Sequence, residues 1–116
     1  MTFEDKSDSE IIEIVDPIMD NLMDASTKID HARHIRDFTD RMKSIVTEDN
    51  LRDVCARYQR EKGFFAERTL ISLVRRPDAV AVLWKQRFTK VGGDFVAEAL
   101  FVERDGKCLV DHAMVW

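Results

Sequence analysis

Residues 95–116 read FVAEALFVERDGKCLVDHAMVW, and this stretch decides the fold. Apolar side chains alternate with polar or small ones on both sides of Asp105 and Gly106, which is typical of two antiparallel strands. An Asp-Gly pair favours a two-residue hairpin turn, so Arg104 is expected to lie opposite Lys107. The two strands of this hairpin are predicted at residues 94–104 and 107–116.

The same pattern continues backwards from this hairpin. Two further strands are predicted near residues 67–75 and 80–90, because β-branched and aromatic residues recur there with a period of two. The segments RPDA and VGGD separate the strands and carry residues that favour turns. The second half of the chain is therefore predicted to be a four-stranded antiparallel meander.

The first half of the chain has the three- and four-residue apolar spacing of amphipathic helices. A first helix is predicted after a cap at Asp8 or Ser9, but Pro17 lies within its pattern. Because proline fits the first turn of a helix and disturbs later ones, the helix either kinks at Pro17 or begins there with Asp16 as its cap. The apolar stripe consists of Ile11, Ile12, Val15, Ile18, Met19, Leu22 and Met23.

Two more helices are predicted before the sheet. One is expected to open at Asp30 and to end before Thr47, with Ile35, Phe38, Met42 and Ile45 on one stripe. Thr47 then caps a third helix, whose end is marked by Gly63. The buried stripe of this third helix is predicted to be Leu51, Val54, Cys55 and Tyr58. The expected fold class is thus α+β, with three N-terminal helices packed on a curved four-stranded meander.

Turn positions also predict the register of the sheet. The Asp-Gly turn pairs Phe101 with Val110 and Ala99 with His112, and a Gly92-Gly93 turn pairs Trp84 with Phe101. Since directly opposed residues share a face, a concave core face follows. It holds Leu73, Ile71, Val80, Val82, Trp84, Phe88, Phe95, Phe101, Val110, Met114 and Trp116. It is crossed by a row of Thr69, Gln86, Ala99 and His112.

The other face is predicted to set Arg87 opposite Glu98 and Lys85 near Asp111. Neighbouring residues on a strand point to opposite faces, so Asp111 is expected to look outward and His112 inward. A direct Asp-His catalytic pair is therefore disfavoured. The outer face also carries Leu83, Leu100, Val102, Leu109 and Val115, and an apolar patch of this kind favours an interface.

Composition limits the function classes. The chain of 116 residues suits one domain, 1–116, and its net charge of −4 with a pI near 5.3 disfavours nucleic acid as a partner. No apolar run is long enough for a membrane span. The two cysteines, Cys55 and Cys108, fit a reduced cytoplasm and are expected to be buried, inert thiols. The histidines of DHARHIRD are interpreted as a solvated helix face, and no metal or cofactor is expected.

Three stretches carry a resemblance to a known superfamily. LWKQRF at residues 83–88, the closing hairpin, and DFTDRMKSIVTEDNLRDVCARYQREKGFF at residues 37–65 resemble the nuclear transport factor 2-like superfamily, in an uncharacterised bacterial branch. That superfamily includes ketosteroid isomerase-like and SnoaL-like proteins. The resemblance implies a cone-shaped, cystatin-like fold with a pocket on the concave face and dimers packed through the sheet. The ketosteroid isomerase pattern is not matched, because no aspartate falls on the predicted concave face and Tyr58 lies on a helix.

The leading hypothesis is a small-ligand-binding or structural dimerisation domain with an apolar concave pocket. The predicted ligand-binding residues are Thr69, Trp84, Gln86, Phe88, Ala99, Phe101, His112, Met114 and Trp116. A homodimer through the convex sheet face and a small apolar ligand are the expected partners. The alternative is an isomerase, dehydratase or cyclase with His112 as general base, oriented by Gln86 and Thr69. A third possibility is that His112 is a core histidine bonded to one of these two residues.

Overall fold

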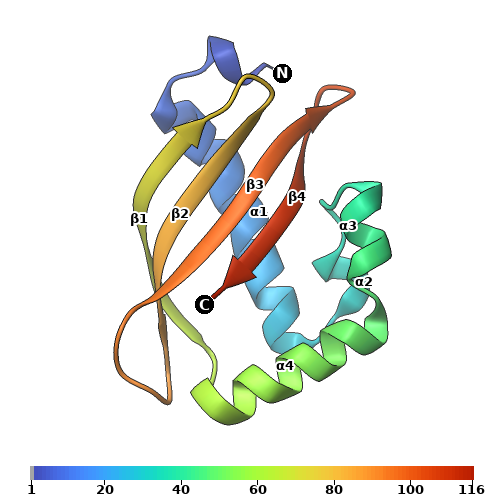
Figure 1. The fold of residues 1–116 in the computed structure, drawn as a ribbon, viewed down its shortest axis with the longest axis vertical. Coiled ribbons are helices and arrows are strands. Elements are labelled where there is room, and N and C mark those ends of the chain that lie inside the picture. Colours follow the sequence, from blue (N-terminus) through green and yellow to red (C-terminus); the bar gives the residue numbers. More distant parts are fainter. Residues whose placement is uncertain (1) are drawn as a thin grey trace.

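A curved antiparallel sheet wraps around the helices in the computed structural model, which describes residues 2–116 (Figure 1). The strands pair in the order β1-β2-β3-β4, so the predicted α+β meander is confirmed. The helical elements are η1 (Phe3–Asp5), α1 (Asp8–Lys28), α2 (His31–His34), α3 (Asp40–Ile45) and α4 (Glu48–Lys62). The strands are β1 (Phe65–Arg75), β2 (Ala79–Phe88), β3 (Phe95–Arg104) and β4 (Lys107–Val115).

Helix α1 is continuous through Pro17, which decides between the two predicted starts. It begins after Ser7, whose side chain accepts a hydrogen bond from the Glu10 amide while the Glu10 carboxylate accepts one from the Ser7 amide. This capping box fixes the first turn well before the proline. The helix ends at Ile29, which has a left-handed backbone with φ of 53°.

The single second helix predicted from Asp30 is wrong, because the chain forms two short helices there. Asp30 does cap α2, but Phe38 leaves the helical path and forms a parallel bridge with Val110 of β4. The Thr39 amide donates to the Val110 carbonyl at 3.0 Å, and the Val110 amide donates to the Asp37 carbonyl at 2.7 Å. Backbone pairing with the sheet edge thus replaces helical hydrogen bonds, and Thr39 caps a new helix, α3.

Helix α4 has the bounds that its end signals predict. The Thr47 hydroxyl accepts a hydrogen bond from the Asn50 amide, and Gly63 ends the helix. Gly63 has φ of 87°, and a Cβ atom there would lie 2.4 Å from the Thr89 hydroxyl and 2.9 Å from the Lys90 amide. Glycine is therefore required both by the backbone conformation and by the close approach of the β2–β3 loop.

The closing hairpin has the predicted turn but a different register beyond it. Arg104 pairs with Lys107 and Phe101 with Val110, as expected, with positive φ at Asp105 and Gly106. The next pair is Leu100 with His112, so Asp111 is an extra residue on β4 and forms a β-bulge. The predicted pair of Ala99 with His112 is therefore wrong.

Because of the bulge, each side chain of β4 after Asp111 points to the face of the sheet opposite to the predicted one. After it, Ala113 pairs with Ala99 and Val115 with Ala97, and these side chains pack on the core. His112, Met114 and Trp116 instead lie on the convex face, where Met114 is 52% and Trp116 61% exposed. The prediction that Asp111 looks outward and His112 inward was wrong.

The β2–β3 hairpin is shifted by four residues from the predicted register. Trp84 pairs with Ala97 and Gln86 with Phe95, because residues 89–94 form a longer loop in place of a two-residue turn. In that loop the amides of Thr89 and Lys90 donate to carbonyls of Phe64 and Lys62 at the end of α4. An even shift preserves the faces, so Ala97, Ala99 and Phe101 remain on the concave side.

That shift also removes the predicted cross-strand ion pair. Glu98 lies opposite Leu83, not Arg87. The Arg87 guanidinium instead lies 3.2 Å from the Asp94 carboxylate in the loop. Lys85, predicted to lie near Asp111, instead pairs with Val96.

In the first hairpin Arg75 pairs with Val80 next to the turn, but strand β1 is irregular. Leu70 pairs with Trp84 and Ser72 with Leu83, so Ile71 is an extra residue. Ile71 is 58% exposed and was wrongly predicted on the core face. Thr69 is also exposed and pairs with Lys85, not with Gln86.

The core lies between α1 and the concave face of the sheet. Its buried hydrophobic residues are Phe3, Ile11, Val15, Met19, Leu22, Met23, Phe38, Met42, Val80, Val82, Trp84, Ala97, Ala99, Phe101 and Val110. Burial of these side chains is the main favourable contribution to folding. None of the helices described here is both long enough and apolar enough to cross a membrane.

Candidate functional site

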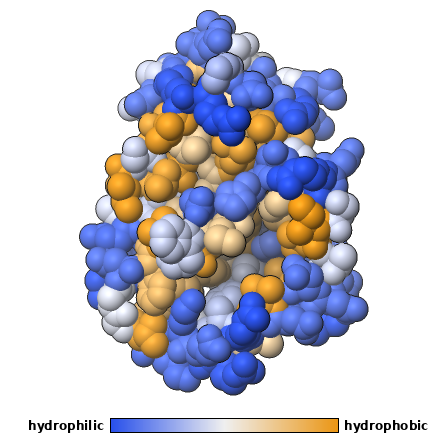
Figure 2. All heavy atoms as spheres, viewed as in Figure 1, coloured by the Kyte–Doolittle hydropathy of each residue, from blue (hydrophilic) through white to orange (hydrophobic). Residues whose placement is uncertain are grey.

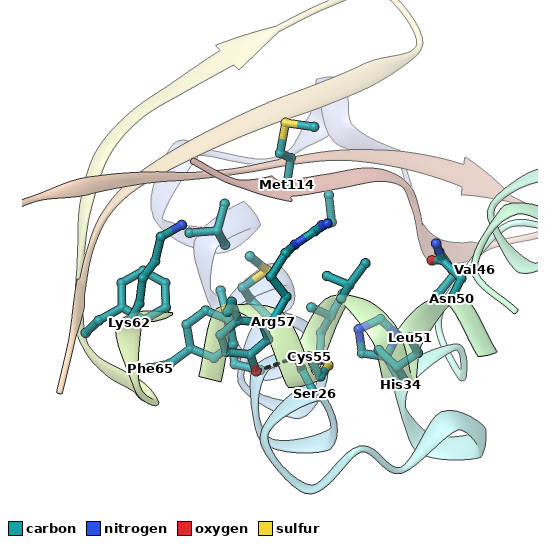
Figure 3. A pocket seen from close by; sticks show the side chains of 18 of the residues that line it. Ser26, His34, Val46, Asn50, Leu51, Cys55, Arg57, Lys62, Phe65 and Met114 are labelled. Atoms are coloured by element: carbon teal, nitrogen blue, oxygen red, sulfur yellow. Dashed lines mark hydrogen bonds between the residues drawn. The ribbon is translucent and has the colours of Figure 1, made fainter. Parts of the chain in front are cut away.

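A pocket of about 470 Å³ opens between the helices and the far end of the sheet. Figure 2 shows that the molecule is hollowed between the sheet and α4, and Figure 3 shows the pocket from close by, with α4 below and β4 above. All four α-helices contribute to its lining, together with residues of β1, β2 and β4. The cone formed by the curved sheet and the helices therefore encloses usable space.

Apolar side chains make up most of the pocket wall. They come from α1, from α3 and its flanking residues, from α4 and from the strands: Met19, Leu22, Met23, Phe38, Met42, Val46, Leu51, Val54, Phe65, Phe88, Ala113 and Val115. At one end, the ring of Phe65 lies 5.0 Å from that of Tyr58 and 5.2 Å from that of Phe88. Such a lining suits a ligand with an apolar body.

Three polar side chains meet on the pocket floor. The hydroxyl of Ser26 on α1 lies 2.8 Å from the Tyr58 hydroxyl and 3.3 Å from the Cys55 sulfur, both on α4. The Gln59 amide group donates to the Thr27 carbonyl at 3.1 Å and fixes the same helix crossing. Burial raises the pKa of Tyr58, so its phenol stays protonated and acts as a neutral hydrogen-bonding group.

His34 lies at the opposite end of the pocket, at the end of α2. Its ring packs edge-on against Phe38 at 5.2 Å, and its Nδ1 atom is buried without a hydrogen-bond partner among residues 2–116. Burial, with a smaller effect of nearby His31, lowers the pKa of His34 to about 4. The imidazole is therefore neutral at pH 7 and has an unused polar atom beside an apolar cavity.

The open side of the pocket carries charged residues of α4. Arg57, Glu61 and Lys62 line it, and Figure 3 shows Arg57 reaching from α4 across the pocket toward β4. The Lys62 ammonium lies over the rings of Phe88 and Phe95, at 5.6 and 5.1 Å from their centroids. This entrance combines two cations with one carboxylate.

The predicted ligand-binding residues do not form one site. Phe88 and Met114 line the pocket, although Figure 3 shows the Met114 side chain pointing away from it. Trp84, Gln86, Ala99 and Phe101 are buried on the concave face as predicted, but none of them lines the pocket. Thr69, His112 and Trp116 lie outside it, for the reasons of register given above.

Gln86 and Arg68 fill the place where the polar row was predicted. The Gln86 side-chain amide donates to the carbonyls of Ala66 at 3.1 Å and Arg87 at 3.0 Å. The Arg68 guanidinium stacks over Trp84 at 5.1 Å and bonds to Asp20 of α1 at 2.7 Å. These contacts make this part of the concave face solid core.

His112 belongs to a cluster on the convex face. Its Nε2 atom lies 3.5 Å from a carboxylate oxygen of Glu98, and the Trp116 indole donates to the other oxygen at 2.5 Å. The interpretation of His112 as a core histidine bonded to Gln86 or Thr69 is therefore wrong. A general-base role for His112 in the pocket is excluded by the same geometry.

The polar pocket residues were missed by the sequence analysis. His34 was assigned to a solvated helix face, and Arg57 was not singled out. The available signal was the spacing of His31 and His34, which share one side of a helix. In the structure that side faces inward, since the His31 ring bonds to the Val46 carbonyl at 2.8 Å.

The two cysteines are free thiols. Burial raises the pKa of Cys108 to about 12, so this thiol is protonated and unreactive at neutral pH. Cys55 is buried against Ser26. Within the described part of the chain, no three His, Cys, Asp or Glu side chains cluster as a metal site would require.

The sequence matches no protein-family model and no curated protein. Solved structures do match. A designed nuclear transport factor 2-like protein, an Rd1NTF2_05 variant, aligns with a TM-score of 0.62 and 15% identity over 88% of this chain and 96% of its own. The SEC-C motif-containing protein RPA3114 of Rhodopseudomonas palustris aligns with a TM-score of 0.56 and 15% identity over 78% of this chain and 70% of its own.

A third match is Bd1075 of Bdellovibrio bacteriovorus, with a TM-score of 0.55 and 11% identity. The alignment covers 94% of this chain but 42% of Bd1075, so the present chain corresponds to less than half of that protein. At these identities the likeness concerns the fold. The chain has a nuclear transport factor 2-like cone fold, as the sequence resemblance implied.

Proposed function

We propose that this domain binds a small, largely apolar ligand in the pocket between α4 and β4. The main support for this proposal is the pocket itself, which has a volume of about 470 Å³, mostly apolar walls and a few polar side chains. Ligand pockets in proteins typically measure about 300 to 1,000 Å³ and have this composition. The unpaired Nδ1 atom of His34 supports the proposal, because a buried polar atom without a partner favours a ligand that supplies one.

Binding is favoured over acid–base catalysis by the state of His34. A general base works best when its pKa is near the working pH, whereas the pKa of His34 is lowered to about 4. The pKa of Tyr58 is raised by burial, which moves it further from neutral pH. His34 and Tyr58 are thus suited to hydrogen bonding and not to proton transfer near pH 7.

Calorimetric titration with 1-octanol tests this proposal. Val54 lines the pocket and is 39% exposed, so Val54→Trp should narrow the cavity without overpacking the core. Ala56→Trp is the matched control, two residues further along α4, exposed and outside the pocket. We expect the wild type and the control to bind 1-octanol and Val54→Trp to bind at least about tenfold more weakly. Equal binding by all three proteins, or no binding by the wild type, would refute the proposal.

We also propose that the convex sheet face packs against a second copy of the chain. Figure 2 shows hydrophobic side chains gathered over the sheet, and Leu83, Leu100 and Leu109 are only half-buried there. Met114 and Trp116 join this face, whereas Val115, predicted on it, packs against the core. The face also carries the charged side chains of Lys85 and Glu98, which alternate with its apolar residues along β2 and β3.

Sedimentation equilibrium decides this second proposal. Leu100→Lys, at the middle of the face, should convert a dimer into a monomer. Leu70→Lys is the matched control, because Leu70 is 45% exposed on the edge strand β1 and is outside the proposed interface. A wild type that stays monomeric at high concentration, or a Leu100→Lys variant that stays dimeric, would contradict the proposal.

A further inference from the structure

The pocket entrance has a cation without a partner. Several arginines of the chain, such as Arg33, Arg41 and Arg75, bond to a carboxylate. Arg57 is the one arginine that lines the pocket, and it has no hydrogen-bond or ion-pair partner in residues 2–116. Its guanidinium therefore keeps its full set of donors available to a molecule in the pocket.

The charge around this entrance is locally positive although the chain is acidic overall. Arg57 and Lys62 oppose Glu61 at the entrance, whereas the net charge of the whole chain is −4. Lys62 is already engaged with the rings of Phe88 and Phe95. Arg57 is thus the group best placed to meet an anion, and one cation in excess matches a single negative charge.

The interior behind Arg57 is neutral and mainly apolar. Met23, Leu51 and Phe65 line it, and its polar side chains, all uncharged, are the Ser26–Tyr58 hydroxyl pair with Cys55 beside it, Asn50, and the neutral ring of His34. A charged group has no partner of opposite sign there and would lose its hydration. An apolar chain or ring system, in contrast, would bury surface at no such cost.

We infer that the ligand is an amphipathic monoanion, such as a medium-chain or aromatic carboxylic acid, whose carboxylate binds Arg57 while its apolar part enters the pocket. A guanidinium donates two parallel hydrogen bonds to a carboxylate, which fixes the ligand's orientation. This inference rests on the proposed function, since it names the ligand class of the same pocket.

The test compares octanoate with 1-octanol, which share the apolar part and differ in charge. In NMR titrations at pH 7.5, Arg57→Gln should weaken octanoate binding about tenfold and leave 1-octanol binding unchanged. Arg60→Gln is the matched control, with the same change of charge on an exposed position of α4 outside the pocket. It should leave both affinities within about twofold of the wild type.

The outcomes separate the two proposals. If 1-octanol binds but octanoate binding is insensitive to Arg57→Gln, the inference about Arg57 is overturned and the proposed function stands. The same holds if Arg57→Gln weakens both ligands equally, since Arg57 would then contribute packing and not charge recognition. If 1-octanol does not bind the wild type, the proposed function itself fails. Octanoate binding to the wild type should also weaken with added salt more than binding to Arg57→Gln.

Discussion

The Asp111 carboxylate accepts a hydrogen bond of 2.7 Å from the hydroxyl of Thr39, a residue 72 positions earlier in the chain. Thr39 caps α3, and Asp111 is the bulged residue of β4. Arg41 also donates to the same carboxylate, at 3.1 Å. The bulge therefore turns Asp111 toward the helices and joins α3 to the sheet edge, while His112 is turned to the convex face.

A double-mutant cycle on Thr39→Val and Asp111→Ala should show this coupling. The hydrogen bond is only partly buried, so we expect a coupling free energy of about 1 kcal/mol in urea denaturation. The hydrogen bond from Thr39 also lowers the pKa of the Asp111 carboxyl, so the stabilisation from this bond should be lost as the pH falls below the ordinary aspartate value of 3.8. Strictly additive single mutants would show that the contact contributes nothing.

His34 should make the domain less stable in mild acid. Its pKa is about 4 when folded and 6.5 in the reference state, so the unfolded chain binds the proton more readily and stability falls as the pH drops from 6.5 toward 4. The loss from this residue between pH 7 and 5 is about 2 kcal/mol. His34→Gln should remove that part of the pH dependence in paired urea titrations. An NMR titration that gives His34 a pKa near 6.5 would contradict the burial described here.

Gln86→Leu should destabilise the domain although it removes a polar group from the core. Gln86 is 1% exposed, and its amide satisfies the Ala66 carbonyl at the irregular start of β1. Leucine would leave that acceptor unpaired, at a cost of about 1 to 3 kcal/mol. Thr69→Ala, at an exposed neighbouring position, should change the free energy of unfolding by less than about 0.5 kcal/mol. Equal effects of the two changes in urea denaturation would argue against the buried role of Gln86.

Gly63→Ala should be strongly destabilising, and Gly92→Ala should not. The added methyl group at Gly63 meets the Thr89 hydroxyl and the Lys90 amide, and the backbone there has positive φ. We expect a loss of about 2 kcal/mol or more in the free energy of unfolding. Gly92 has open space around its Cβ position and no positive φ, so thermal and urea unfolding of Gly92→Ala should match the wild type. If Gly63→Ala unfolds like the wild type, the close approach of Thr89 and Lys90 to Gly63 described here is contradicted.

Local chemistry was predictable from the sequence, and long-range contacts were not. The Thr47 cap, the Gly63 end and the Asp105-Gly106 turn depend on neighbouring residues alone, and all three were predicted correctly. The bulge at Asp111 depends on α3, and the break at Phe38 depends on pairing with β4. The residues next to Asp111 and Phe38 in the sequence do not indicate that α3 or β4 will pack against them.

The candidate site was missed for the same reason. One bulge moved His112 out of the concave face, and the inward turn of α2 moved His34 into the pocket. The four-residue shift between β2 and β3 did not change the predicted faces of these strands, because an even shift leaves every side chain on the same face of the sheet. Trp84 and Phe101 are buried on the concave side as predicted, but there they form core and not a binding surface.

The central claim is that the apolar space between α4 and β4 receives the ligand. Spectra of the methionine methyl groups during titration with 1-octanol test it most directly, because Met19, Met23 and Met42 line the pocket, whereas the Trp116 indole lies outside it on the convex face. We predict that these three methyl resonances shift together and saturate at one dissociation constant. Shifts confined to the Trp116 indole, with the three methyl groups unmoved, would contradict the claim and place the binding surface on the convex face.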